Sequence, residues 1–268
     1  HFVAAADGVP MTIPVGPGTR YQMTEADLVA HWGERVRGAF IASPANPTGT
    51  SIPFDELTRI VNAVRARAGF VIVDEIYLDL YYGPSGDAGS HRARTAVELG
   101  EDVIVTNSFS KYFNMTGWRL GWMVLPPALV PELEKLAQNL FICPSTLAQQ
   151  AALACFEPAT LAIYEDRKAA FRRRRDYLVP ALQQAGLAIP AAPDGAFYVY
   201  ADCSASGLDS TTYARRLLEQ ADVSLVPGTD FGQADPDRYL RISYATALDD
   251  LKEAVARIAR FNAGLNRG

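Results

Sequence analysis

The chain has 268 residues, about half of them apolar, which is enough for one large domain or two modest ones. A net charge of −5 and a pI near 5.3 argue against nucleic acid or an anionic membrane as a partner. No apolar run is long enough to span a membrane, and the three widely spaced cysteines provide neither a disulfide framework nor a zinc-binding pattern. We therefore expect a cytoplasmic protein without a metal site.

The first half of the chain alternates short apolar runs with one clear amphipathic pattern. Residues 38–42, 70–73, 103–105 and 121–125 are apolar runs of strand length. Apolar positions repeat at intervals of three and four over residues 54–68, which predicts a helix. Strands that alternate with helices in this order indicate an α/β unit with a largely parallel sheet.

The second half is richer in helical patterns. It predicts helices over 129–141, 147–156, 159–185 and 211–220, strands over 196–200, 223–226 and 239–244, and a last helix after Thr246. We therefore expect a mixed, mostly parallel sheet sandwiched by helices in residues 1–165 and a smaller α+β domain in residues 166–268. The one basic run, the four arginines at 172–175, lies in a helical pattern and is typical of a solvated helix face.

Three polar clusters follow three of the predicted strands, at residues 43–46, 74–77 and 108–111. Ligands of parallel sheets bind beyond the carboxyl ends of the strands, so we expect the clusters to converge on one edge of the sheet. Lys111 is the only lysine of the four that follows a strand and has no acid near it in the sequence. If the protein uses an amine, it is this one.

These clusters contain groups that an aldehyde cofactor with a pyridine ring needs from a protein. Lys111 supplies the amine for a Schiff base, and Asp74 can face the ring nitrogen and keep it protonated. Tyr77 and Asn46 can donate to the ring hydroxyl. As an alternative, Asp74 could be a turn residue at a strand end, and Asn46, which lies between two prolines, could serve only the turn.

Three further residues suit a phosphate group. Ser108 and Ser110 offer hydroxyls, and Arg119 offers a rigid fork of donors that fits phosphate oxygens. Ser110 could instead cap a turn.

The order of the motifs resembles that of the class I/II aminotransferases, which are fold-type I enzymes that use pyridoxal 5′-phosphate. The resemblance rests on SPANPTG (43–49), DEIY (74–77), SFSK (108–111) and GWRLG (117–121). It continues through GAFY (195–198), the segment 227–232 and the strand LRIS (240–243), and so covers nearly the whole chain.

The resemblance implies an activity and a role for each residue. It implies transamination between an amino acid and a 2-oxo acid, with 2-oxoglutarate as the expected acceptor, in a homodimer. Lys111 would be the Schiff-base lysine and proton carrier, and Asp74 and Tyr77 would act with it on the ring. Arg241, helped by Asn46, would bind the α-carboxylate of the substrate. An arginine on a strand could also be a solvated ion-pair partner.

The sequence departs from the family in one respect, because it lacks the family's N-terminal portion. In relatives that portion supplies further phosphate ligands, a ring-stacking aromatic residue and contacts to the neighbouring subunit. Two kinds of alternative remain open. Other fold-type I enzymes, such as C–S β-lyases and decarboxylases, share these residues. The aminotransferase-like ligand-binding module of some transcription regulators also resembles this chain.

Overall fold

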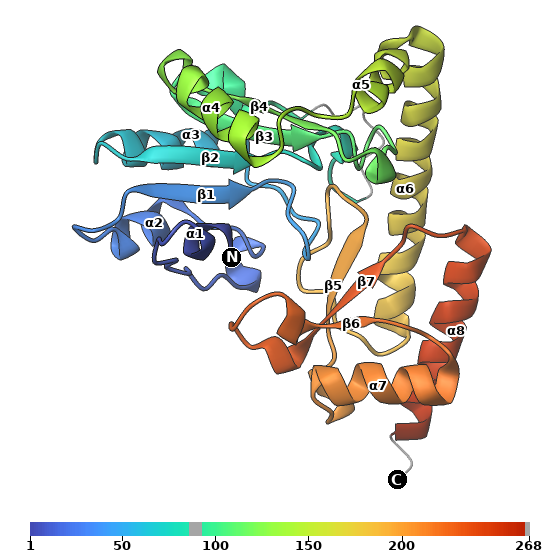
Figure 1. Cartoon of the computed structure of the whole chain (residues 1–268). Coiled ribbons are helices and arrows are strands. Elements are labelled where there is room, and N and C mark those ends of the chain that lie inside the picture. The colour runs from blue at the N-terminus through green and yellow to red at the C-terminus, as the bar shows by residue number, and fades with distance from the viewer. Residues whose placement is uncertain (86–92, 266–268) are drawn as a thin grey trace.

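The computed structural model describes residues 1–85 and 93–265 (Figure 1). Its larger sheet has the strand order β1-β2-β3-β4. The strands are β1 (Gly38–Ala42), β2 (Phe70–Asp74), β3 (Val103–Ser108) and β4 (Gly121–Val124). The first three are parallel and β4 is antiparallel to β3, so the prediction of a mixed, mostly parallel sheet is confirmed.

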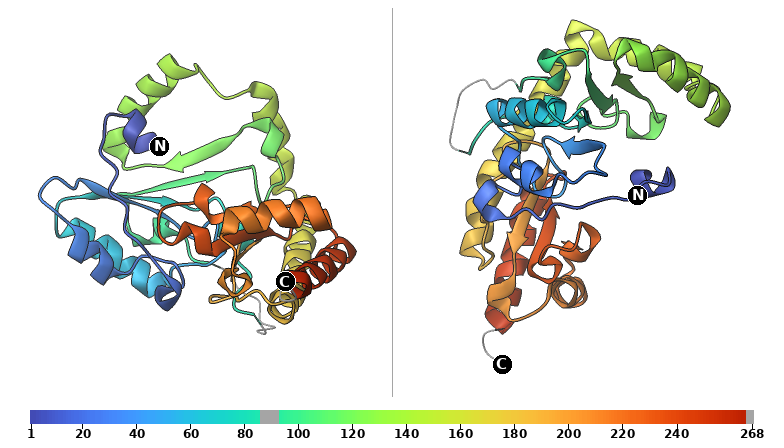
Figure 2. Two further views of the ribbon diagram at one scale, coloured as in Figure 1. Left: turned by 90° about the horizontal axis from the view of Figure 1, so that it is seen from below. Right: turned by 90° about the vertical axis from the view of Figure 1, so that its left-hand side faces the viewer.

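Helices pack against this sheet through the apolar positions that the sequence pattern indicates. In α3 (Phe54–Arg65), the side chains of Leu57, Ile60, Val61 and Val64 are buried. They form one core with the β-branched residues of β2 and with Leu28 of α2 (Glu25–His31). The short helix α1 (Phe2–Ala5) has no buried residue and stands clear of both sheets (Figure 2).

The second sheet is antiparallel and has the order β5-β7-β6. Its strands are β5 (Tyr198–Asp202), β6 (Val226–Pro227) and β7 (Tyr239–Ser243). The helices of this half are α4 (Val130–Leu140), α5 (Thr146–Leu153), α6 (Pro158–Gln184), α7 (Ser210–Ala221) and α8 (Leu248–Leu265). α6 and α8 pack side by side behind this sheet, and α7 contacts α8 (Figure 1).

α6 takes part in the packing of both halves. Tyr164, near its start, joins Phe109 and Phe113 in one apolar cluster, whereas Leu182, near its end, lies in the core of the second sheet. The predicted boundary between residues 165 and 166 therefore falls inside a continuous helix. The division into two domains stays a prediction, and its last three residues, 266–268, lie outside the described part of the chain.

Three predicted strands differ from the observed ones by more than one residue at an end. β3 continues to Ser108, because Ser108 pairs with Gly121 of β4. β5 begins two residues later than predicted, since Ala196 adopts a left-handed φ of 55°. β6 contains only two residues, so the prediction of a strand over 223–226 was wrong.

The basic run was also misjudged in part. Arg175 is completely buried, although residues 172–175 were predicted to form a solvated face. Its Nη1 donates to the carbonyl oxygens of Gly83 at 2.6 Å and Pro193 at 2.8 Å, and this arginine thereby ties α6 to two loops. Among residues 1–85 and 93–265, no helix is both long and apolar enough to cross a bilayer.

Candidate active site

The predicted site residues of the first half gather at one edge of the larger sheet. Asp74 ends β2, Ser108 ends β3, and Asn46 lies in the loop that follows β1. Arg241 comes from β7 of the second sheet, and its Nη1 donates a hydrogen bond to Oδ1 of Asn46 at 3.0 Å. The site therefore lies where the two sheets meet.

Lys111 follows β3 and is half-buried. Its Nζ lies 5.7 Å from the ring centroid of Tyr77 and 5.8 Å from that of Phe197. Burial lowers the pKa of this amine, and the positive charges of Arg119 and Arg241 lower it further. Among the described residues it has no ion-pair partner. A lysine in such a place is neutral, and hence nucleophilic, at a lower pH than an exposed one.

Asp74 is the last residue of β2, and Tyr77 lies three residues after it. Burial raises the pKa of Asp74, and the hydrogen bond that Ile76 N–H donates to its Oδ1 at 3.0 Å opposes this effect. Tyr77 is buried, and its hydroxyl lies 3.1 Å from that of Tyr198. Burial also raises the pKa of Tyr77, so it remains a phenol that can donate. A half-buried carboxylate whose pKa is lowered by no cation among the described residues suits a ligand that carries a proton.

The loop that contains the predicted phosphate ligands is folded onto itself. Ser110 N–H donates to Oγ of Ser108 at 3.1 Å, and Thr116 Oγ1 donates to the carbonyl oxygen of Ser110 at 2.5 Å. Arg119 is exposed, and its Nη1 donates to the carbonyl oxygen of Thr116 at 2.9 Å. These bonds hold the two serines and the arginine on one short segment beside Lys111.

Arg241 has the surroundings of an anion-binding arginine. Its Cζ lies 4.7 Å from the ring centroids of both Tyr198 and Phe231. Its Nε is buried and finds no hydrogen-bond partner in the described part of the chain. A buried donor without a partner is costly, so an oxygen ligand at Nε would remove a penalty.

Sequence reasoning missed the roles of three aromatic residues, Phe197, Tyr198 and Phe231. Phe197 lies against Lys111, and the other two flank the guanidinium of Arg241. The signal was present, because all three lie within the motifs at 195–198 and 227–232, but the sequence does not show which side chain they face. In residues 1–85 and 93–265, no group of three or more His, Cys, Asp or Glu side chains could hold a metal ion.

Known proteins of one enzyme family resemble this chain over most of its length. The sequence profile of the aminotransferase class I and II family matches residues 2–258. The valine–pyruvate aminotransferase of Mycobacterium tuberculosis is 40% identical over 246 residues, which are 92% of this chain and 62% of that protein. The aspartate aminotransferase of Pyrococcus abyssi is 33% identical over 261 residues, which are 96% and 65% of the two chains. This chain thus spans somewhat less than two thirds of these relatives.

Two solved structures also resemble this chain over nearly all of its length. The crystal structure of an aminotransferase from Mycobacterium tuberculosis superposes with a TM-score of 0.91 at 38% identity, over 98% of this chain and 66% of that one. The Thermus thermophilus aspartate aminotransferase with maleate gives 0.86 at 33% identity, over 96% and 65%. The chain therefore belongs to the class I and II aminotransferases, a family of fold-type I enzymes that use pyridoxal 5′-phosphate.

Proposed function

We propose that the protein transfers an amino group between an amino acid and a 2-oxo acid, with 2-oxoglutarate as acceptor. The observation that carries this proposal is the pairing of a lysine of lowered pKa, Lys111, with an arginine whose buried Nε lacks a partner, Arg241. The first is a nucleophilic amine and the second is a carboxylate-binding group. Together they suit a substrate that carries both a carbonyl or amino carbon and a carboxylate.

The donor set fits pyridoxal 5′-phosphate. Lys111 would hold the aldehyde carbon, and Asp74 would hold the protonated ring nitrogen, for which its buried carboxylate has no competing cation. Tyr77 and Asn46 would contact the ring hydroxyl. The phosphate would take its ligands from Ser108, Ser110 and Arg119, which are linked on one segment.

When bound, the cofactor supplies a ring that withdraws electrons from the substrate α-carbon. Arg241 would bind the α-carboxylate of the substrate, and the rings of Tyr198 and Phe231, which flank its guanidinium, would hold the guanidinium in place. Once the substrate amine had displaced Lys111 from the aldehyde carbon, its free Nζ would be able to take the α-carbon proton and deliver it to the former aldehyde carbon, which requires the neutral amine that its lowered pKa favours.

The names of the relatives support transamination but differ in the amino acid. They include valine–pyruvate, aspartate and aromatic-amino-acid aminotransferases. The binding groups described above explain only the α-carboxylate, so the choice of amino acid is left to a substrate screen, with pyruvate tested beside 2-oxoglutarate as acceptor. A homodimer is part of the proposal.

The first experiment is cofactor binding by the wild-type protein and by Lys111→Ala. We expect visible absorbance of bound cofactor in the wild type and its loss in the variant, with Lys135→Ala, on the exposed face of α4, as the matched control. An unchanged visible spectrum in Lys111→Ala would contradict the assignment.

A product assay then separates the alternatives. Amino transfer to the acceptor supports the proposal, whereas pyruvate with ammonia indicates a β-lyase and carbon dioxide indicates a decarboxylase. Ligand binding without turnover indicates a regulatory module.

A further inference from the structure

Two loops hold the groups that orient Arg241. Asn46, which accepts its hydrogen bond, lies in the loop 43–52 after β1, and Tyr198, which stacks on it, begins β5 directly after the loop 192–197. The position of the guanidinium therefore depends on how these two loops are fixed to each other.

The loops are in direct backbone contact. Asp194 N–H and Gly195 N–H both donate to the carbonyl oxygen of Gly49, at 3.0 and 2.9 Å. Gly49 has a φ of +67°, and a Cβ at this position would lie 2.6 Å from Cβ of Pro193 and 2.7 Å from the carbonyl oxygen of Tyr198. The contact is so close that only glycine fits.

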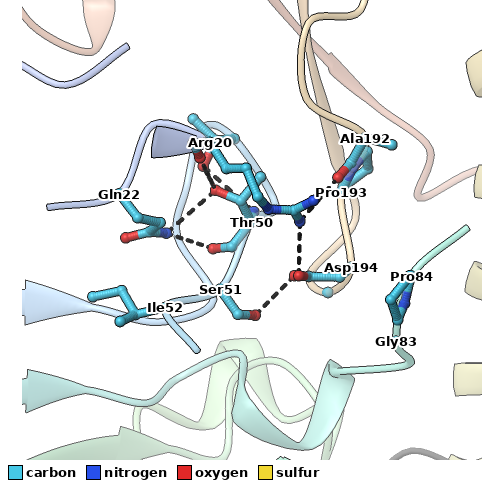
Figure 3. Close-up of polar contacts among 12 residues, drawn as sticks. Arg20, Gln22, Thr50, Ser51, Ile52, Gly83, Pro84, Ala192, Pro193 and Asp194 are labelled. Atoms are coloured by element: carbon cyan, nitrogen blue, oxygen red, sulfur yellow. Dashed lines mark hydrogen bonds and ion pairs between the residues drawn. The ribbon is translucent and has the colours of Figure 1, made fainter. Parts of the chain in front are cut away.

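The side chain of Asp194 adds a bridge across this contact (Figure 3). Its Oδ1 accepts from Ser51 Oγ at 2.8 Å, and its Oδ2 accepts from Arg20 Nη2 at 2.8 Å. The same Arg20 nitrogen donates to the carbonyl oxygen of Ala192 at 3.3 Å. Asp194 is buried, so these bonds are the ones that satisfy its charge, and they tie its loop to Ser51 of the other.

A third segment, residues 20–22, is tied to both loops. Thr50 Oγ1 donates to the carbonyl oxygen of Arg20 at 2.7 Å, and Gln22 Nε2 donates to the carbonyl oxygen of Thr50 at 2.5 Å. The ring of Tyr21 packs edge-on against Tyr200 of β5 at 5.5 Å. Arg20 and Tyr21 have φ values of 57° and 59°, which non-glycine residues rarely adopt in succession unless surrounding contacts hold them.

We propose that Asp194 is a positioning residue for the substrate carboxylate: by binding Arg20 and Ser51 it fixes the loops that carry Asn46 and Tyr198. It thereby sets the orientation of Arg241, which it does not touch. The inference rests on the proposed function in one respect, namely that Arg241 binds the carboxylate. It adds a residue whose effect on substrate binding is indirect.

The opposite end of β5 offers a matched control. Asp202 ends the strand that Asp194 precedes, and its Oδ2 accepts from Arg238 Nε at 2.8 Å. The two ion pairs are alike in exposure, with side-chain values of 10% for Asp194 and 45% for Arg20 against 5% for Asp202 and 50% for Arg238. Both aspartates are buried acids paired with half-exposed arginines, but the side chain of Asp202 bonds to Ser204 and Arg238 and to neither of the loops 43–52 and 192–197.

The test uses the full protein loaded with cofactor and compares Asp194→Asn with Asp202→Asn. The readouts are the Kd of succinate, which has neither an amino nor an oxo group, the KM and kcat for the 2-oxo acid, and Tm. For Asp194→Asn we expect Kd and KM to rise about tenfold, the equivalent of one hydrogen bond to a charged group, with kcat changed by less than about twofold. Asp202→Asn should lower Tm comparably and leave Kd and KM as in the wild type.

The proposal is overturned if both variants weaken succinate binding equally, or if Asp194→Asn lowers Tm alone. If Asp194→Asn fails to fold, Ser51→Ala and Arg20→Met test the proposal instead. Each variant removes one hydrogen bond to Asp194, and each changes a side chain that is less buried than that of Asp194. Both are expected to raise Kd in the same direction by less than Asp194→Asn. A wild type that binds succinate without transaminating would refute the proposed function, and the Kd series would still test the role of Asp194.

Discussion

Arg241 and Asn46 are 195 residues apart in the sequence, yet Arg241 Nη1 donates to Asn46 Oδ1 at 3.0 Å. This bond joins the two sheets directly at the candidate site. It also leaves Nε of Arg241 as the buried donor without a partner. A carboxylate bound to Arg241 would therefore share the guanidinium with Asn46.

Changing Asn46 to Asp should weaken carboxylate binding more than changing it to Ala. The new carboxylate would form an ion pair with Arg241 and repel the ligand, whereas Ala only removes a neutral acceptor. We expect the Kd of succinate to rise about tenfold in Asn46→Asp and by about threefold in Asn46→Ala, measured by titration calorimetry. Equal affinity of Asn46→Asp and the wild type would contradict the assignment of Arg241.

Lys111 should lose its proton below the usual lysine value near 10.5. Burial is the main cause, followed by Arg119 and Arg241, so Arg119→Met should raise the pKa of Lys111. The pH dependence of the acylation rate at Lys111 in the cofactor-free protein measures this. Arg238→Met is the control and should leave the midpoint in place, because Arg238 pairs with Asp202 and is not among the charges that lower the pKa of Lys111.

The lowered pKa of Lys111 also determines how its contribution to the free energy of unfolding depends on pH. Because the folded-state pKa of Lys111 lies below its unfolded value, the unfolded chain binds more protons between the two values. Stability contributed by this residue therefore rises as the pH increases through that interval.

The ionised carboxylate of Asp74 should lower the free energy of unfolding of the cofactor-free protein. Burial raises its pKa, so between the usual value near 3.8 and the raised value the folded protein binds more protons than the unfolded chain. Stability falls as the pH rises through this window. At neutral pH Asp74→Asn should therefore raise the free energy of unfolding of the cofactor-free protein in urea, while kcat falls at least about 100-fold. Asp166→Asn, on α6, is the exposed control, and a lower stability of Asp74→Asn would contradict the expectation.

Gly49→Ala should be strongly destabilising. The added Cβ would meet Pro193 Cβ at 2.6 Å in addition to the strain of a φ of +67°, so we expect a loss of about 3 kcal/mol in urea unfolding. Gly207→Ala is the matched control, because its φ is +72° but nothing lies within 4 Å of its Cβ. That variant should lose only about 1 kcal/mol. Similar losses in both would mean that the contact with Pro193 relaxes without cost.

Arg175→Met should cost about 3–5 kcal/mol, because it leaves the carbonyl oxygens of Gly83 and Pro193 without their donor in a buried place. Arg173→Met, two positions earlier and exposed, should change the free energy of unfolding by less than about 0.5 kcal/mol. Thermal and urea unfolding of both variants compare the two positions. A small effect at Arg175 would mean that water replaces its hydrogen bonds.

The sequence predicted those parts of the fold that depend on local periodicity. The helix at 54–68 and the strand at 70–73 follow from apolar spacing alone, and both are present with small shifts at their ends. The convergence of Asn46, Asp74 and Ser108 followed from one topological rule about parallel strands. Their roles toward a cofactor were inferred from resemblance and stay predictions.

What the sequence could not predict depends on contacts between distant segments. Arg172, Arg173, Arg174 and Arg175 are chemically identical, and contacts with distant groups, among them the carbonyl oxygens of Gly83 and Pro193, distinguish the last of them. The partners of Asp194 are Arg20 and Ser51, and they too come from segments that meet only in the folded structure. A pattern within one element contains no information about such partners.

The continuity of α6 has a mechanical consequence. Its 27 residues form a rod about 40 Å long at 1.5 Å per residue, embedded at one end beside Phe113 and at the other beside Leu217. A continuous helix of this length moves as a rigid body, so a tilt at one end also displaces the other end, which a flexible linker would not do. Pro180 donates no hydrogen bond to the helix turn before it, which makes that turn the place where the rod bends most easily. A shift at one end of α6 would thus be passed on to the apolar cluster at its other end.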